Sequence, residues 1–255
     1  KKLILNFGMI NNAYLMETLA NYYNQSLQEG LALRRTTAIS VLDSIKFETG
    51  EQLPPTEYWA KHKSKGLYLL NDESAWPMVH FLQQSLENNK ITDADFEVIT
   101  GVTRSGNDAF IFDKKIIVRD IVCKNGYVHV LEDVLIPPAN MAQHIRDNSN
   151  TQTFSSLLER FSGPYYNSDM TTEYKQINPS FTDSIFSKKY FAFETTGGAE
   201  RYPNGLSIKD DNLLPFSPGW NSYQTPNKVM QADMAAIFAP TDVAMDEYFN
   251  VGKGI

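Results

Sequence analysis

The side chains that could do chemistry in this sequence are few and widely spaced. Three of the four histidines, His62, His80 and His144, show no metal-ligand spacing to one another. His129 lies in an expected strand, which favours a hydrogen-bonded structural role, because a catalytic histidine needs a nucleophile or carboxylate partner that the sequence does not identify. A hydrolase that uses His129 or a pair of carboxylates stays open as the enzymatic hypothesis.

Two other groups with reactive potential have structural explanations. Cys123 is the single cysteine, so the chain can form neither an intramolecular disulfide nor a multi-cysteine metal site, and its place in an expected strand favours a small hydrophobic role. The run Asp210-Asp211-Asn212 lacks the glycine and the terminal glutamate of a calcium-binding loop. No phosphate-binding, nucleophile-elbow or zinc-protease motif occurs. We therefore expect a protein that is not an enzyme, with no catalytic residues, metal or cofactor.

Aromatic residues are the strongest candidates for binding. Many of them fall in residues 163–227, a stretch without a regular hydrophobic period. Exposed Tyr and Trp rings stack on sugar faces or anchor protein interfaces. Tyr190, Tyr202, Trp220 and Tyr223 are therefore the candidate ligand-binding residues. The alternative is that these rings form a small local core that holds the segment together.

A β-hairpin is predicted between Ile116 and Pro138. The first strand is almost continuously apolar and β-branched, and Asn125-Gly126 favours a type I′ turn. The double proline at Pro137-Pro138 ends the second strand, since proline cannot donate to a sheet ladder. The expected register pairs Lys124 with Tyr127, Cys123 with Val128 and Val122 with His129.

Helical spacing of apolar residues predicts a mainly helical segment at residues 9–33 and another helix at Phe154–Phe161. Asp72 or Asn71 is expected to cap a helix that continues past Pro77. Thr92 is expected to cap a further short helix, which gives way to a strand at Phe96–Val102. The sequence thus mixes helices and strands and predicts an α+β fold.

Composition limits the class of partner. The chain has 255 residues, of which 42% are hydrophobic and 21% charged, as in a globular protein. Its net charge of −7 argues against nucleic acid, because phosphate binding needs a basic face. The pairs Lys188-Lys189 and Arg34-Arg35 are expected to be solvated. No apolar run approaches the roughly 18 residues of a membrane-spanning helix, so no transmembrane segment is expected.

Two segments resemble conserved boxes of the fasciclin domain family. NGYVHVLEDVLIPP, at Asn125–Pro138, is similar to the box that closes such a domain, and IFAPTDVAM, at Ile237–Met245, is similar to the box near a domain's beginning. Because the closing box comes first, the two boxes belong to different copies of the domain. LLNDESAW, at Leu69–Trp76, fits the opening box of the first copy, with Asp72 matching Thr241 as the helix cap. It departs from the family at Asn71, where the family has proline.

The resemblance implies two tandem fasciclin-like domains, each a β-wedge or sandwich with packed helices. We expect domain one at residues 1–139 with an insertion at about 24–65, a polar linker at 140–152, and domain two at 153–255 with an insertion at about 163–233. The second copy lacks a closing box. We therefore expect only its N-terminal part here, within a longer protein or completed by a partner that supplies the missing strands.

The resemblance also implies non-enzymatic binding or adhesion at a cell surface, through protein or glycan contacts. In animal fasciclin domains an Asp-Ile pair at the place of Asp120-Ile121 is linked to integrin binding, so these two are candidate interaction residues. The alternative is a strand position with an outward carboxylate. Within the resemblance, the long insertions favour a bacterial lipoprotein, lipid-anchored to the outer membrane through a segment outside this chain. The alternative function is an accessory structural subunit of an outer-membrane nutrient-import complex.

Overall fold

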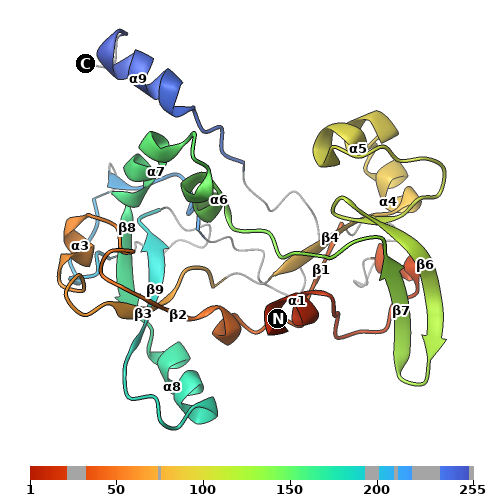
Figure 1. Cartoon of the computed structure of the whole chain (residues 1–255), viewed down its shortest axis with the longest axis horizontal. Coiled ribbons are helices and arrows are strands. Elements are labelled where there is room, and N and C mark those ends of the chain that lie inside the picture. Colours follow the sequence, from red (N-terminus) through yellow and green to blue (C-terminus); the bar gives the residue numbers. More distant parts are fainter. Residues whose placement is uncertain (22–32, 74–75, 193–200, 210–211, 220–235, 253–255) are drawn as a thin grey trace. The chain divides into compact units, whose positions relative to one another are not determined.

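The computed structural model shows an α+β fold whose strands form two sheets (Figure 1). The residues that it describes are 1–21, 33–73, 76–192, 201–209, 212–219 and 236–252. The chain divides into two compact units. Unit 1 holds Lys1–Ile39 and Ala75–Pro138, and unit 2 holds Ser40–Ser74, Ala139–Ser222 and Ala235–Ile255.

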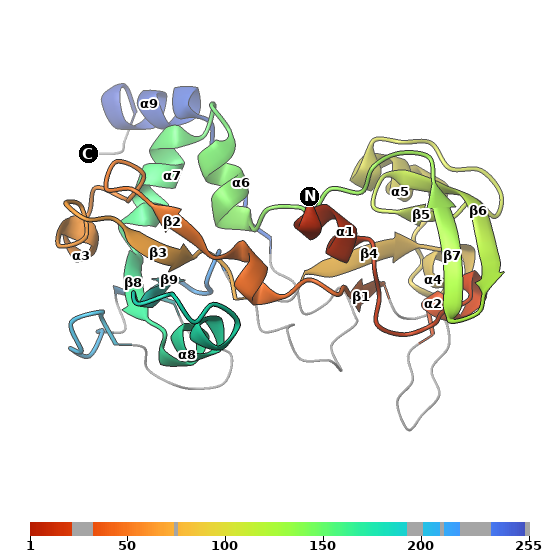
Figure 2. The ribbon, with the colours of Figure 1, turned by 60° about the horizontal axis from the view of Figure 1, so that its bottom comes forward.

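Unit 1 is built on an antiparallel sheet with the strand order β1-β4-β5-β6-β7. The strands are β1 (Arg34–Thr36), β4 (Pro77–Phe81), β5 (Phe110–Ile111), β6 (Lys114–Cys123) and β7 (Gly126–Leu131). The helices of this unit are α1 (Lys2–Phe7), α2 (Met16–Leu19), α4 (Gln83–Asn88) and α5 (Asp93–Thr100). β7 is the last strand at one side of this sheet. Within the described part of the chain, its outer edge therefore has no neighbouring strand (Figure 2).

Part of the core of unit 1 forms where α5 meets the sheet. Phe96 is fully buried, and its ring centroid lies 5.2 Å from that of Phe81 and 4.8 Å from that of Phe110. α5 begins with a capping box, in which Thr92 accepts a hydrogen bond from the Asp95 backbone N–H and the Asp95 carboxylate accepts one from the Thr92 N–H. The predicted cap at Thr92 is therefore confirmed, and it fixes the helix that carries Phe96.

β6 and β7 form the predicted hairpin, with a register that differs from the prediction. Lys124 and Asn125 form the turn, and Cys123 pairs with Gly126 rather than with Val128. The expected type I′ turn at Asn125-Gly126 is wrong, because neither residue has a positive φ. The turn begins one residue earlier, and this moves the partner of each residue near the hairpin tip by two positions.

Unit 2 is built on a sheet with the strand order β2-β3-β9-β8, in which β3 and β9 are parallel and the other pairs antiparallel. The strands are β2 (Lys46–Glu48), β3 (Leu67–Leu70), β8 (Ser162–Tyr166) and β9 (Ile185–Tyr190). The helices are the 3-10 helix η1 (Val41–Ser44) and the α-helices α3 (Glu57–Ala60), α6 (Met141–Asp147), α7 (Gln152–Glu159), α8 (Ser168–Ile177) and α9 (Asp242–Asn250). α6 and α7 pack against each other (Figure 1).

The start of α9 caps the start of α7. The Asp242 carboxylate accepts hydrogen bonds from the backbone N–H groups of Thr153 at 2.7 Å and Gln152 at 3.1 Å. The bond from Thr153 is the main reason that the pKa of Asp242 lies below its usual value. The Thr241 hydroxyl accepts from the Ala244 N–H at 3.3 Å, so the predicted cap at Thr241 is confirmed.

The chain passes between the two units at more places than the sequence predicts. The passage at Pro138–Ala139 coincides with the predicted end of domain one. Residues 40–74, however, contribute β2, α3 and β3 to unit 2, although most of this stretch was expected as an insertion in domain one. The parallel pairing of β3 with β9 joins segments that are far apart in sequence. The predicted linker at 140–152 contains α6 and the first residue of α7.

Other local predictions have mixed outcomes. α7 confirms the helix predicted at Phe154–Phe161. The helix predicted at residues 9–33 is wrong for the described residues 9–21, where helix is confined to α2. The helix predicted beyond Asp72 is wrong, because Pro77 begins β4, a position that a residue without an N–H tolerates. The strand predicted at Phe96–Val102 is wrong, because α5 runs to Thr100.

Candidate functional site

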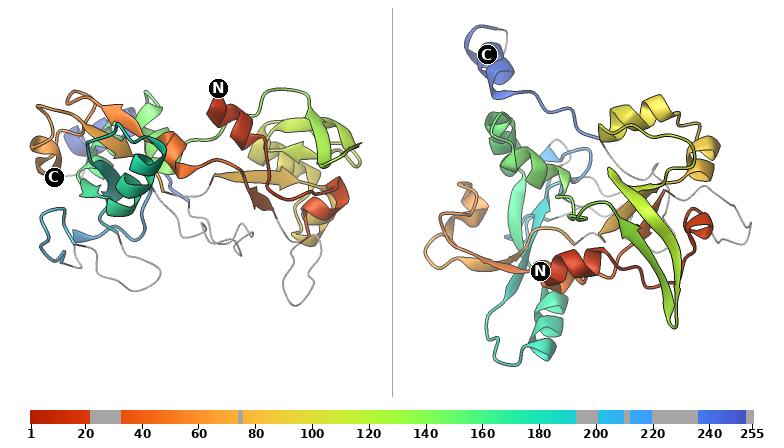
Figure 3. Two further views of the ribbon diagram at one scale, coloured as in Figure 1. Left: turned by 90° about the horizontal axis from the view of Figure 1, so that it is seen from below. Right: turned by 45° about the vertical axis from the view of Figure 1, so that its right-hand side comes forward.

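The β6–β7 hairpin exposes apolar side chains to solvent. Val122 is 79% exposed and Val128 is 47% exposed. Neighbouring residues of a strand point to opposite faces, so exposure of both Ile121 and Val122 means that both faces of this hairpin contribute. Figure 3 shows the backbone of the hairpin, coloured yellow-green, from two further directions. We call this surface the hairpin patch; it consists of Ile117, Val118, Ile121, Val122, Tyr127, Val128 and Val130. Contiguous apolar surface of this kind marks interaction sites on proteins.

Asp120 ties the hairpin to the N-terminal segment. It lies where the pairing register shifts between Val118 and Ile121, and its φ is 59°, a left-handed value that Asp tolerates better than most residues. Its carboxylate accepts a hydrogen bond from the Met16 N–H at 2.8 Å. Of the two predicted interaction residues, Ile121 therefore lies on the exposed hairpin patch, whereas Asp120 makes an internal contact.

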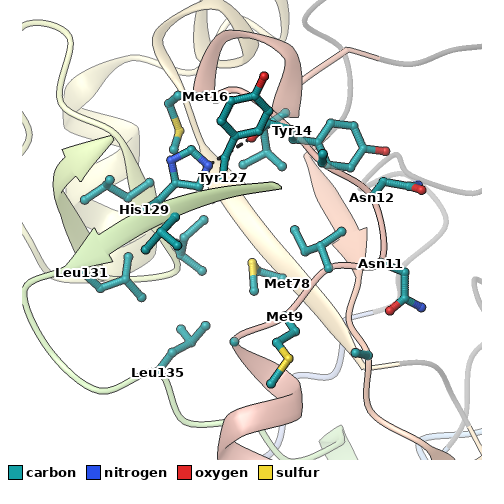
Figure 4. A pocket seen from close by; sticks show the side chains of 18 of the residues that line it. Met9, Asn11, Asn12, Tyr14, Met16, Met78, Tyr127, His129, Leu131 and Leu135 are labelled. Atoms are coloured by element: carbon teal, nitrogen blue, oxygen red, sulfur yellow. Dashed lines mark hydrogen bonds between the residues drawn. The ribbon is translucent and has the colours of Figure 1, made fainter. Parts of the chain in front are cut away.

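His129 makes a second tie between the same two segments. Its Nδ1 accepts a hydrogen bond from the Asp120 N–H at 3.1 Å, so the ring proton lies on Nε2, which donates to the Tyr14 carbonyl at 3.1 Å (Figure 4). Both ring nitrogens are thus engaged in structural bonds. The expectation of a hydrogen-bonded structural histidine is confirmed. The Nε2 bond engages the Tyr14 carbonyl, two residues before α2 begins at Met16.

A cavity of about 540 Å³ lies beside the hairpin within unit 1. We call it the hairpin cavity. Met78, Ile111, Ile116 and Leu135 form its buried apolar part. Figure 4 shows Asn11 and Asn12 on one side of the cavity, with Leu131 and Leu135 on the other. Among the described residues that line it, none has a carboxylate, ammonium or guanidinium group.

Unit 1 also buries basic groups that the sequence analysis missed. The expectation that Arg34-Arg35 is solvated is wrong, because both residues are buried in β1. Arg35 Nε donates to the Leu19 carbonyl at 2.8 Å, and its guanidinium carbon lies 4.5 Å from the ring centroid of Tyr14. His80, on β4, is fully buried, and burial followed by the nearby charge of Arg35 lowers its pKa to about 3.

The two candidate aromatic residues that the structure describes, Tyr190 and Tyr202, do not form an exposed binding surface. Tyr190 is only 2% exposed, so the prediction that it presents its ring to a ligand is wrong. Tyr202 is half-buried and its ring stacks on that of Tyr58, with centroids 5.3 Å apart and an angle of 13° between planes. Trp220 and Tyr223 lie outside the described residues. The described rings thus fit the alternative of a small local core.

A buried polar cluster in unit 2 surrounds Glu159. The Lys188 ammonium lies 2.7 Å from the Glu159 carboxylate, Arg146 Nη1 lies 3.2 Å from it, and the hydroxyls of Tyr190 and Ser162 donate to it at 2.9 Å. Burial lowers the pKa of Lys188 to about 8, against the opposing pull of Glu159. Burial alone would raise the pKa of Glu159, but Lys188 and then Arg146 hold it below its usual value.

The Glu159 cluster acts as a structural anchor between α7 and β9. Every polar group named in it has a partner, so it leaves no side chain free to act as a nucleophile or base. The expectation that Lys188 is solvated is wrong, because Lys188 is 6% exposed. The available signal was the run KKYFAFE that begins at Lys188, because its aromatic residues favour a strand. Burial of Lys188 there depends on a distant carboxylate that sequence does not locate.

Comparison of the chain with protein-family models, with curated proteins and with solved structures gave no match. Within the described segments, no group of three or more His, Cys, Asp or Glu residues is placed to hold a metal ion. None of the helices in those segments combines the length and the apolar character that crossing a membrane requires. The hairpin patch and the hairpin cavity, both in unit 1, are therefore the candidate functional sites.

Proposed function

We propose that this chain is a non-enzymatic binding protein that contacts a protein partner through the hairpin patch. The exposed apolar surface of β6 and β7 carries this proposal. β-branched and aromatic side chains are exposed to solvent on both faces of the β6–β7 hairpin. The outer edge of β7 presents backbone groups that can pair with a partner strand, a common mode of peptide and protein recognition.

A protein partner fits this surface better than a glycan does. Sugar recognition uses aromatic platforms and polar groups, whereas the hairpin patch contains one tyrosine, Tyr127, among aliphatic residues. In unit 2, Tyr190 is buried and one face of Tyr202 is occupied by Tyr58. Main-chain pairing would supply affinity along β7, and exposed side chains such as Val128 and Val130 would supply specificity.

The proposal includes a fasciclin-like architecture at a bacterial cell surface. Two local features support it: the Asn125–Pro138 box contains a hairpin strand, and Thr241 in the Ile237–Met245 box caps α9. Leu69–Trp76 does not support it, because β3 belongs to unit 2 and β4 to unit 1, and the described residues between these strands form no helix. Extracellular location and lipid anchoring through a segment outside this chain follow from the family resemblance.

A second candidate function, a structural subunit of an outer-membrane nutrient-import complex, is favoured by the surface of unit 2 around α9. Phe238 is 94% exposed and Val251 is 82% exposed, and Val243 and Tyr248 on α9 are also exposed. Apolar side chains in such numbers on one short segment are typical of a surface that another protein covers. This surface predicts stable association of unit 2 with a membrane protein.

Co-purification separates these functions. Detergent-solubilised outer membranes would be passed over the immobilised chain, over Val122→Asp in the hairpin patch, and over Val98→Asp on α5. Val98 is 88% exposed outside the patch and provides the matched control. We expect Val122→Asp to lose a specific partner and Val98→Asp to retain it. Equal retention by both variants would contradict a role of the patch. Loss of the partner only in a Val251→Asp variant would favour the structural-subunit function through the surface around α9. Binding on a glycan array, without any protein partner, would favour a glycan-binding function.

A further inference from the structure

We propose that the hairpin cavity of unit 1 binds a neutral small molecule with an apolar chain and an uncharged polar end, such as an alcohol, ester or amide. The cavity shares Tyr127 and Val128 with the hairpin patch and extends from there to the buried side chains of Met78, Ile111 and Ile116, which the patch does not contain. Its volume of about 540 Å³ lies inside the range of about 300–1,000 Å³ that is usual for small-molecule sites.

The apolar part of the cavity suits a flexible hydrocarbon chain. Met16, Met78, Ile111, Ile116 and Leu135 are all buried and line one continuous cavity. Methionine is unbranched and polarisable, so two of these side chains can adjust to ligands of somewhat different shape. Each methylene group that moves from water into such a site raises affinity by about fourfold.

The polar part of the cavity contains uncharged donors and acceptors. The amides of Asn11, Asn12 and Asn125 and the phenol of Tyr127 belong to its lining. Figure 4 places Asn11 and Asn12 across the cavity from Leu131 and Leu135. A ligand can therefore place its polar group at the exposed rim of the cavity near Asn11 and Asn12 and its chain against the leucines.

The lack of charged side chains among the described lining residues favours a neutral ligand. None of the described lining residues is Lys, Arg, Asp or Glu, and both ring nitrogens of His129 are already engaged in hydrogen bonds with Asp120 and Tyr14. A carboxylate or ammonium ligand would lose its hydration without gaining a counterion, which is costly in an apolar site. A neutral head group avoids this cost.

Isothermal titration of the purified chain with three probes of equal chain length tests this assignment: dodecanol, dodecanoate and dodecylammonium, each below its aggregation concentration. We expect dodecanol to bind at least about tenfold more tightly than either charged probe. Decanol should bind more weakly than dodecanol by up to about fifteenfold, since it lacks two methylene groups. Equal binding of all three probes, or no binding of dodecanol, would overturn the proposal. Either result would leave the protein-binding role of the hairpin patch unaffected.

A bulky side chain in the cavity should remove binding. Ala38 lines the cavity and is partly exposed, so Ala38→Phe fills it with little change to the core. Met9→Trp, at a residue that is 49% exposed, provides a second filling variant in case the first folds poorly. The matched control is Ala94→Phe on the exposed side of α5. We expect the filling variants to bind dodecanol at least about tenfold more weakly and Ala94→Phe to bind as the wild type does. Unchanged binding in both folded filling variants would place the probe elsewhere and contradict the assignment.

Discussion

His80 should make the folded chain lose stability in mild acid. This residue lies on β4, is fully buried, and has no hydrogen-bond partner for either ring nitrogen among the described residues. Burial, followed by the charge of Arg35, lowers its pKa from 6.5 to about 3. The folded chain therefore keeps the ring neutral over a pH range in which the unfolded chain protonates it.

The sign and size of the effect follow from the two pKa values of His80. Since the pKa is lower in the folded state, stability is highest above about pH 6.5 and falls as the pH decreases toward 3. Each pH unit well inside this window removes about 1.4 kcal/mol from the free energy of unfolding. Acidification from about pH 6.5 to about pH 4.5 should therefore remove about 2–3 kcal/mol through His80 alone.

Urea denaturation followed by circular dichroism measures this loss. His80→Met keeps a side chain of similar length that cannot titrate, and His144→Met is the control, because His144 is exposed on α6. Between about pH 6.5 and 4.5, His80→Met should gain about 2–3 kcal/mol in unfolding free energy relative to the wild type. His144→Met should follow the wild type closely. Parallel curves for His80→Met and the wild type would refute this role of His80.

Three further substitutions test the interior of the two units by urea denaturation. Glu159→Gln should lower the free energy of unfolding by about 3 kcal/mol, because Lys188 would stay buried without its counterion, whereas the exposed Glu173→Gln on α8 should change it little. Asp120→Ala should lower the free energy of unfolding by about 2–3 kcal/mol and Asp120→Gly by about 1 kcal/mol. Both variants lose the hydrogen bond from Met16, but only alanine adds backbone strain at φ 59°. Equal losses in the two variants would argue against strain. Phe96→Ala should cost about 3–5 kcal/mol, and a cost below about 1 kcal/mol would contradict its place in the core.

Local chemistry made several elements predictable from sequence. Thr92 and Thr241 are hydroxyl caps that precede helices, and both caps form as predicted. The apolar β-branched run from Ile116 and the turn residues near Asn125 predicted a hairpin, and β6 and β7 form it. In each case the signal and the structure depend on residues close together in sequence.

Tertiary contacts decided the features that sequence did not reveal. The register of the hairpin depends on the bulge at Asp120, whose carboxylate and N–H bond to Met16 and His129, and no local pattern predicts these bonds. The segment around Tyr14 is apolar at helical spacing, but the hairpin occupies its backbone groups. The burial of Lys188 depends on Glu159, a residue of another element.

The domain organisation is the largest difference between sequence and structure. Sequence patterns treated residues 40–74 as part of the first of two consecutive domains, whereas β3 pairs in parallel with β9 in unit 2. Such a pairing brings together strands from distant parts of the chain, and strand patterns do not specify a distant partner. The hairpin cavity was also missed, because its walls come from the N-terminal segment, β4 and the hairpin together.

Photo-crosslinking from the hairpin tip is the sharpest test of partner binding by the hairpin patch. Cys123 is the single cysteine of the chain and is exposed in β6, so it can carry a benzophenone label without any engineered residue. After irradiation with solubilised outer membranes, we expect a discrete crosslink to a second protein in the wild type and in Val98→Asp, and its loss in Val122→Asp. Crosslinks of equal yield in both variants, or only crosslinks between copies of this chain, would contradict a protein partner at the hairpin patch.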